Sequence, residues 1–183
     1  RALGCIIQAA DDHGHLIGSH HHSGTDFKAW QEGGPLNHYA MQLSAKADAV
    51  HRGAVEAFET AQGRYQVIYS ENTAIGADPN DMRRFAWAAA MGGTMPMILN
   101  MDIASTPTEL LKQCRFLQQF FESTDFYTMS PHDELAHGQT TWVLADPGRS
   151  AIVYAIRPVD KMGVKQLTAG RYDVTWLDCV SGR

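Results

Sequence analysis

The chain of 183 residues carries a net charge of −5, with 44% apolar and 19% charged residues. This composition indicates a folded globular protein and excludes a disordered chain. The negative charge disfavours nucleic acid or an anionic membrane as the main partner, and no apolar run in the sequence is long enough to span a bilayer.

The amino-terminal third of the chain alternates predicted helices with predicted strands. Helices are recognised by apolar residues at helical spacing, and strands by short apolar runs bounded by turn residues. Because the chain opens in the middle of this alternation, we expect it to be a fragment of a longer protein. The predicted elements are a helix over 2–10, a strand over 15–19, a short helix over 26–30, a strand over 37–43 and a helix over 45–62.

A buried strand over 65–69 organises the chain, because a polar loop and a further helix follow it. Asp78 or Asn80 can cap this helix, and the two glycines at 92–93 end it. Glu71 stands where the strand gives way to the loop. Parallel α/β folds and barrels place their chemistry at this end of a strand.

The alternation continues through the next segment. A further apolar run predicts a strand over 95–103, and Pro107 with Glu109 marks the start of a helix that reaches Glu122. Repeated alternation of strand and helix indicates βα units around a parallel sheet, with right-handed connections.

The pattern changes after Phe126, where helical spacing is lost and turn residues separate short apolar runs. Such a pattern is typical of an antiparallel β module, with fewer strands than a complete β-sandwich needs. We therefore predict two domains, an α/β domain over 1–130 and a partial antiparallel β-sandwich over 131–183. The predicted strands of the second domain are 140–145, 151–156, 164–167 and 172–177.

Three stretches, in this order, resemble segments of one enzyme family. They are AADDHGHLIGSHH, then VIYSENTAIG with MRRFAWAAAMGG, then AIVYAI with AGRYDVTWLDCVSGR. In them the chain is similar to the carboxyl-terminal half of the apiosidase-like glycoside hydrolases. These are bacterial (β/α)-barrel enzymes whose barrel is followed by a small β-sandwich, labelled as a collagen-binding domain of a collagenase. The chain departs from the family pattern in two places: His13 stands where Pro is usual, and Cys179-Val180-Ser181 replaces Pro-Arg-Thr.

The resemblance implies that the α/β domain is the carboxyl-terminal half of a (β/α)8 TIM barrel, with the last four of its eight strands. It implies a secreted or periplasmic bacterial hydrolase that degrades a complex polysaccharide. The family's nucleophile ends the seventh barrel strand, which corresponds to Glu71 here. The acid/base carboxylate would lie upstream of Arg1, so the fragment alone is expected to be inactive.

Retaining glycoside hydrolysis uses two carboxylates. One attacks the anomeric carbon, and the other protonates the leaving oxygen and then activates water. Glu71 fits the attacking role by its position. Alternatively, Glu71 caps the following helix or pairs with Arg83 or Arg84.

Polar and aromatic residues near the predicted strand ends are candidates for binding the sugar. Histidine is also a common metal ligand, but no Cys or Glu at ligand spacing accompanies the histidines, so we predict neither a metal nor a cofactor. Core packing or turn formation is the alternative role for each candidate. The candidate substrate-binding residues are His20, His22, Trp30, Gln42, Asn72 and Asp102.

Two other functions stay open at this point. One is a non-catalytic carbohydrate- or matrix-binding protein on a degenerate barrel, with the β module as the binding part. The other is a structural subunit without a ligand, which a Glu71 held by Arg83 would favour. A carboxylate at the end of the fourth barrel strand, upstream of Arg1, would distinguish the hydrolase from the binding protein.

Overall fold

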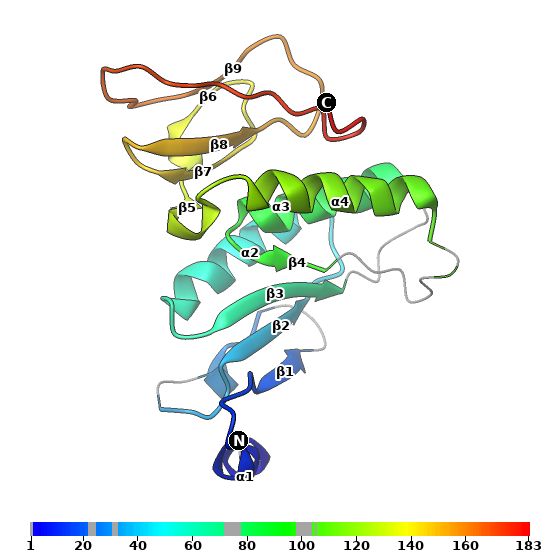
Figure 1. The fold of residues 1–183 in the computed structure, drawn as a ribbon, viewed down its shortest axis with the longest axis vertical. Coiled ribbons are helices and arrows are strands. Elements are labelled where there is room, and N and C mark those ends of the chain that lie inside the picture. The colour runs from blue at the N-terminus through cyan, green and yellow to red at the C-terminus, as the bar shows by residue number, and fades with distance from the viewer. Residues whose placement is uncertain (1, 22–24, 31–32, 72–77, 98–103, 105) are drawn as a thin grey trace.

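The computed structural model describes residues 2–21, 25–30, 33–71, 78–97, 104 and 106–183. Its first part alternates helices with strands, and its second part contains short strands (Figure 1) and 3-10 helices, which are named η here. The first part contains α1 (Ala2–Ala10), β1 (Gly18–His21), η1 (Lys28–Trp30), β2 (His38–Gln42), α2 (Ala47–Ala61), β3 (Gln66–Glu71), α3 (Pro79–Met91), β4 (Met95–Pro96) and α4 (Thr108–Glu122). The second part contains η3 (Phe126–Thr128), β5 (Ser130–Pro131), η4 (Asp133–Leu135), β6 (Ala136–Gly138), β7 (Trp142–Asp146), β8 (Ser150–Tyr154) and β9 (Met162–Val164).

The strands of the first part form one parallel sheet in the order β1-β2-β3-β4, so the predicted parallel α/β arrangement is confirmed. Successive side chains on a strand point to opposite faces of the sheet. On β2 and β3, Ala40 and Ile68 point to one face and are half-buried. The other face packs with α2 and α3 in one apolar cluster, and it carries the buried residues Tyr39, Met41, Val67 and Tyr69. Of the strand predicted over 95–103, Met95–Pro96 forms β4, and residues 98–103 lie outside the described part of the chain.

Helix α3 begins at Pro79, two residues before the predicted start near Asp81, and its cap Asp78 and its end at Gly92 are as predicted. The side chain of Asp78 accepts a hydrogen bond from the backbone N–H of Asn80 at 2.8 Å, and Pro79 occupies the first turn. Gly92 and Gly93 end the helix, and Gly93 has a φ of +82°. A side chain at Gly92 would meet α2, because its Cβ would lie 2.5 Å from the Cβ of Ala54.

The second part forms antiparallel sheets, β5-β7-β8 and β6-β9, in agreement with the predicted antiparallel module. The prediction of a strand over 172–177 is wrong, because this segment belongs to no sheet of the described residues. Tyr172, Val174 and Trp176 have the alternating pattern of a strand, but Trp176 is 71% exposed. An alternating pattern forms a strand only where a neighbouring strand supplies hydrogen bonds and packing.

Four aromatic rings stack between the two parts of the molecule. The ring of Trp87 on α3 stacks on Tyr154 of β8 with centroids 5.2 Å apart, and Tyr154 stacks on Trp142 of β7 at 5.5 Å. Trp142 in turn stacks on His51 of α2 at 4.5 Å. Because Trp87, Trp142 and Tyr154 belong to one buried apolar cluster, the core is continuous across the predicted boundary at residue 130. Figure 1 shows the short strands of the second part packed over α3 and α4.

Candidate functional site

A β-bulge decides which face of the sheet carries Glu71. Met41 on β2 is aligned with Tyr69 on β3, but the next residue, Gln42, is aligned with Glu71, so Ser70 is an extra residue in β3. Simple alternation from Tyr69 would turn Glu71 toward the helices. The extra residue places Glu71 on the opposite face instead, together with its aligned neighbour Gln42.

The same face carries His20 at the end of β1. His20 is aligned with Ala40, and Ala40 is aligned with Ile68, so all three side chains share the face that the helices do not cover. The Nε2 atom of His20 lies 3.9 Å from the Oε2 atom of Glu71, across the width of β2. The two side chains are 47% and 25% exposed, so the carboxylate is partly desolvated and still reachable from solvent.

Both residues lie at the carboxyl ends of their strands. Figure 1 shows β1, β2 and β3 side by side and parallel. Their carboxyl ends, which carry His20, Gln42 and Glu71, therefore lie at the same end of the sheet. This is the edge at which open α/β sheets and barrels bind ligands. The structure therefore brings together three of the predicted site residues, and a carboxylate there can act as a nucleophile, a base or a hydrogen-bond acceptor.

The two arginines on α3 have other partners than Glu71. Arg83 donates to the side-chain oxygens of Asn80 at 2.9 Å and Gln113 at 3.3 Å. Arg84 pairs with Asp81 at 3.2 Å. The helix cap is supplied by Asp78. Within the described residues, Glu71 therefore neither caps α3 nor pairs with Arg83 or Arg84.

Two of the predicted binding residues, Trp30 and Gln42, are buried, and three others lie outside the residues that the structure describes. Trp30 is only 4% exposed, and its indole N–H donates to the backbone oxygen of His38 at 3.0 Å. Its ring packs edge-on against Tyr39 with centroids 4.5 Å apart. Trp30 is therefore a core residue, which corrects its prediction as a surface on which a sugar could stack. Gln42 is also buried, at 7% exposure. His22, Asn72 and Asp102 lie outside the described residues.

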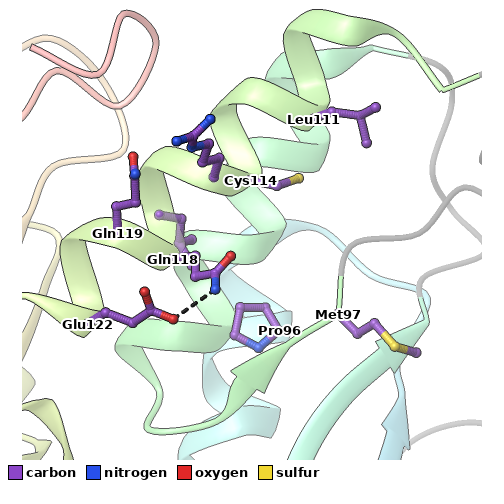
Figure 2. Close-up of a pocket in the computed structure, with 9 residues that line it drawn as sticks. Pro96, Met97, Leu111, Cys114, Gln118, Gln119 and Glu122 are labelled. Carbon is purple, nitrogen blue, oxygen red and sulfur yellow. Dashed lines mark hydrogen bonds between the residues drawn. The ribbon is translucent and has the colours of Figure 1, made fainter.

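A groove lies away from Glu71, between α4 and the edge strand β4 (Figure 2). Gln118 and Glu122 of α4 form a hydrogen bond of 2.7 Å on one side of it, and Pro96 and Met97 lie across from them. The groove brings no histidine or second carboxylate beside Glu122 among its lining residues. Its lining is a mixture of apolar side chains with Arg115, two glutamines and Glu122. The lining residues are Pro96, Met97, Leu111, Cys114, Arg115, Leu117, Gln118, Gln119 and Glu122.

Sequence reasoning missed a cluster of a serine, a histidine and a glutamate that runs from β5 into η4. The Oγ atom of Ser130 lies 3.1 Å from Nε2 of His132, and Nδ1 of His132 lies 2.7 Å from Oε1 of Glu134. The hydrogen bond with His132 holds the pKa of Glu134 below its usual value. The order serine, histidine, carboxylate is that of a nucleophilic triad. However, Glu134 is 66% exposed and all three residues fall within five positions, which favours a local role in ordering the turn. The spacing S-x-H-x-E is the signal that could have indicated this cluster.

Comparison with known proteins yields no relative: no family model matches the chain, and no curated protein or solved structure matches it. None of the described helices is long and apolar enough to cross a membrane. In the described part of the chain, no group of three or more His, Cys, Asp or Glu side chains is placed to hold a metal ion. The candidate site is therefore defined by the geometry of Glu71, His20 and Gln42.

Proposed function

We propose that this chain is part of a glycoside hydrolase that cleaves glycosidic bonds with retention, with Glu71 as its nucleophile. The observation that supports this proposal best is the bulge at Ser70, which turns Glu71 toward His20 at the carboxyl edge of a parallel sheet. Bulges beside active sites commonly re-aim a side chain in this way. The sequence resemblance to apiosidase-like hydrolases supports the same role for the same residue.

The proposal includes a (β/α)8 barrel. Its support is the consecutive order of four parallel strands, each of the last three followed by a helix. Both edges of the sheet carry exposed apolar side chains: Leu16 before β1 is 54% exposed, and Met95 on β4 is 52% exposed. Strands outside residues 1–183 that pair with β1 and β4 would cover these side chains and close the sheet.

In the proposed reaction, the carboxylate of Glu71 attacks the anomeric carbon while a second carboxylic acid protonates the departing oxygen. A covalent glycosyl-enzyme forms, and water activated by the second carboxylate then cleaves it. This second group, from outside residues 1–183, would lie about 5–5.5 Å from Glu71. His20 is close enough to orient the Glu71 carboxylate or to hydrogen-bond a sugar hydroxyl. Gln42, His22, Asn72 and Asp102 remain proposed subsite residues.

The decisive experiment substitutes Glu71→Gln in the complete protein that contains this chain. Hydrolysis of 4-nitrophenyl glycosides, covering pentosides and hexosides of both anomeric forms, is compared with that of the wild type. We expect loss of at least about 1,000-fold in kcat, because the amide cannot form the covalent intermediate. The matched control is Glu59→Gln, an exposed glutamate on α2, which should keep wild-type activity.

Two further readouts identify the role of Glu71. Proton NMR of the first-formed sugar should show retained anomeric configuration. Dinitrophenyl 2-deoxy-2-fluoroglycosides, whose leaving group needs no acid, should label Glu71, and peptide mapping locates the adduct. Full activity of Glu71→Gln on any glycoside that the wild type cleaves would show that Glu71 is not the nucleophile. Sugar binding by the wild type without turnover would favour a carbohydrate-binding protein instead.

A further inference from the structure

We infer that Ser70 is a positioning residue. Its hydroxyl holds the β-bulge and so keeps the Glu71 carboxylate on the open face of the sheet, which is the face that the helices do not cover. The catalytic part of this inference rests on the proposed function. Its structural part concerns the backbone of β2 and β3 only, so it can be tested separately.

The hydroxyl of Ser70 bonds the neighbouring strand at the point where the register shifts. Its Oγ atom donates to the backbone oxygen of Met41 at 2.9 Å. The extra residue of a bulge has no counterpart on the partner strand, so its backbone contributes less to the ladder. The side chain of Ser70 thus supplies a cross-strand hydrogen bond at the one position where the register of β3 gains a residue.

Two more hydrogen bonds connect the residues on either side of Ser70 to a single residue of the chain after β2. The backbone N–H of Leu43 donates to the backbone oxygen of Glu71 at 3.2 Å. The hydroxyl of Tyr69 donates to the backbone oxygen of Leu43 at 3.1 Å. Together, these three hydrogen bonds hold Ser70 and Glu71 of β3 opposite a single residue of β2, Gln42.

The bulge has a large effect on Glu71 because a shift of one residue in a strand moves a side chain to the other face. If Ser70 paired with β2 as an ordinary strand residue, Glu71 would share the face of Tyr69, which is 4% exposed and packs in the core under the helices. A carboxylate on that face would lose its water and could not approach His20. The open-face position of Glu71 therefore depends on Ser70 staying outside the ladder.

The structural experiment measures hydrogen exchange of the Leu43 amide by NMR in Ser70→Ala and Ser70→Thr. Loss of the hydroxyl should speed exchange of the Leu43 amide about 2- to 10-fold, the range that one net hydrogen bond supports. Thr retains a hydroxyl and suits a strand, so it should restore slow exchange. The Gln66 amide, which donates to Asn37 at the other end of β3, serves as the unaffected control.

The catalytic experiment measures the same variants on the 4-nitrophenyl glycoside that the wild type cleaves best. Ser70→Ala should lower kcat about 10- to 100-fold with KM within about 2-fold, because a displaced nucleophile weakens the transition state more than substrate binding. Ser70→Thr should recover kcat to within about 3-fold of the wild type. A purely structural role would lower the melting temperature without this recovery of kcat.

The two experiments separate the possible failures. Unchanged Leu43 exchange in Ser70→Ala would overturn the inference, even if Glu71→Gln is inactive and the proposed function stands. Faster Leu43 exchange together with an active Glu71→Gln would keep the positioning role and reject the proposed nucleophile. Faster Leu43 exchange with an unchanged kcat would reject the catalytic part of the inference. If no glycoside is cleaved, the exchange of the Leu43 amide alone decides the structural part.

Discussion

His51 joins three distant segments through one side chain. Its ring is buried, with Nδ1 3.0 Å from the backbone oxygen of Ala88 on α3 and Nε2 2.7 Å from Oδ2 of Asp133 on η4. The other carboxylate oxygen of Asp133 accepts the backbone N–H of Val143 at 3.0 Å. Asp133 therefore satisfies two groups, and its removal would leave both without this acceptor.

Asp133→Ala is expected to lower the free energy of unfolding by about 1–3 kcal/mol. The buried His51 loses its acceptor, and partial exposure of Asp133 keeps the loss below that of a fully buried pair. Urea unfolding followed by circular dichroism measures the change. Asp160→Ala, at an exposed aspartate of the second part, is the control. Equal stability of the two variants would mean that the His51–Asp133 bond contributes nothing net.

The thiol of Cys179 makes the free energy of unfolding depend on pH in the alkaline range. Burial raises the pKa of its thiol from 9.0 to about 11. Burial also raises the pKa of the nearby Tyr154. Between about pH 9 and 11 the unfolded thiol loses its proton while the folded thiol keeps it, so the folded state binds more protons. The contribution of the Cys179 thiol to the free energy of unfolding is therefore fully present below pH 9 and is lost as the pH rises toward 11.

Cys179→Ala should make the fall in unfolding free energy between pH 9 and 11 shallower by about 2 kcal/mol, because each pKa unit corresponds to about 1.4 kcal/mol. Urea titrations at several pH values measure the slope. Cys5→Ala, at an exposed cysteine, should leave the slope unchanged. The same slope for both variants would show that the Cys179 thiol ionises as readily in the folded protein as in the unfolded one.

At the scale of elements, the close approach of α2 and α3 depends on a small residue at the end of α3. A Cβ at Gly92 would also lie 3.1 Å from the backbone oxygen of His51, in addition to the clash with Ala54. Neither neighbour is the end of a flexible side chain, so the helices would have to separate. Their separation would also disturb the stack that begins at His51 and Trp142.

Gly92→Ala is expected to destabilise the protein by about 1–3 kcal/mol through overpacking. Thermal unfolding measures the loss as a lower melting temperature. Gly170→Ala is the matched control, because the nearest atoms to its added Cβ lie 3.9 Å away. If Gly92→Ala were as stable as this control, the contact between α2 and α3 would have to be more adaptable than the structure indicates.

At the scale of the whole molecule, the parallel sheet and the β module share one core. Buried residues of β2 and β3, of α2 to α4 and of β7 and β8 belong to the same apolar cluster. Residues that share a core lose their packing together when either part opens. The stacked rings of Trp87, Tyr154 and Trp142 lie in the centre of this shared region.

We therefore expect residues 1–183 to unfold in a single transition. Far-UV circular dichroism, which reports mainly the helices, and tryptophan fluorescence, which includes Trp142 of β7, should give coincident curves in urea. Trp142→Ala should lower both midpoints together by removing one of the two inner rings of the stack. Two separated transitions would instead indicate that the β module unfolds independently.

Much of the fold could be predicted from local sequence. Alternating helix and strand patterns predicted a parallel sheet, and Asp78, Gly92 and Gly93 marked the ends of α3 correctly. These features depend on backbone preferences and hydrogen bonds within a few residues. The segment 172–177 was predicted wrongly, because strand formation also depends on a neighbour that local pattern cannot supply.

For the candidate site, the sequence by itself determined that a carboxylate, Glu71, ends a buried strand. Only the tertiary structure decided which face Glu71 occupies and that His20 is its neighbour. The bulge depends on a bond between Ser70 and Met41, which are 29 residues apart in the chain. Similarly, Trp30 was predicted to bind sugar, but its side chain is buried and its indole N–H donates to the backbone oxygen of His38. Contacts of this range form only when the strands pair, so no local pattern contains them.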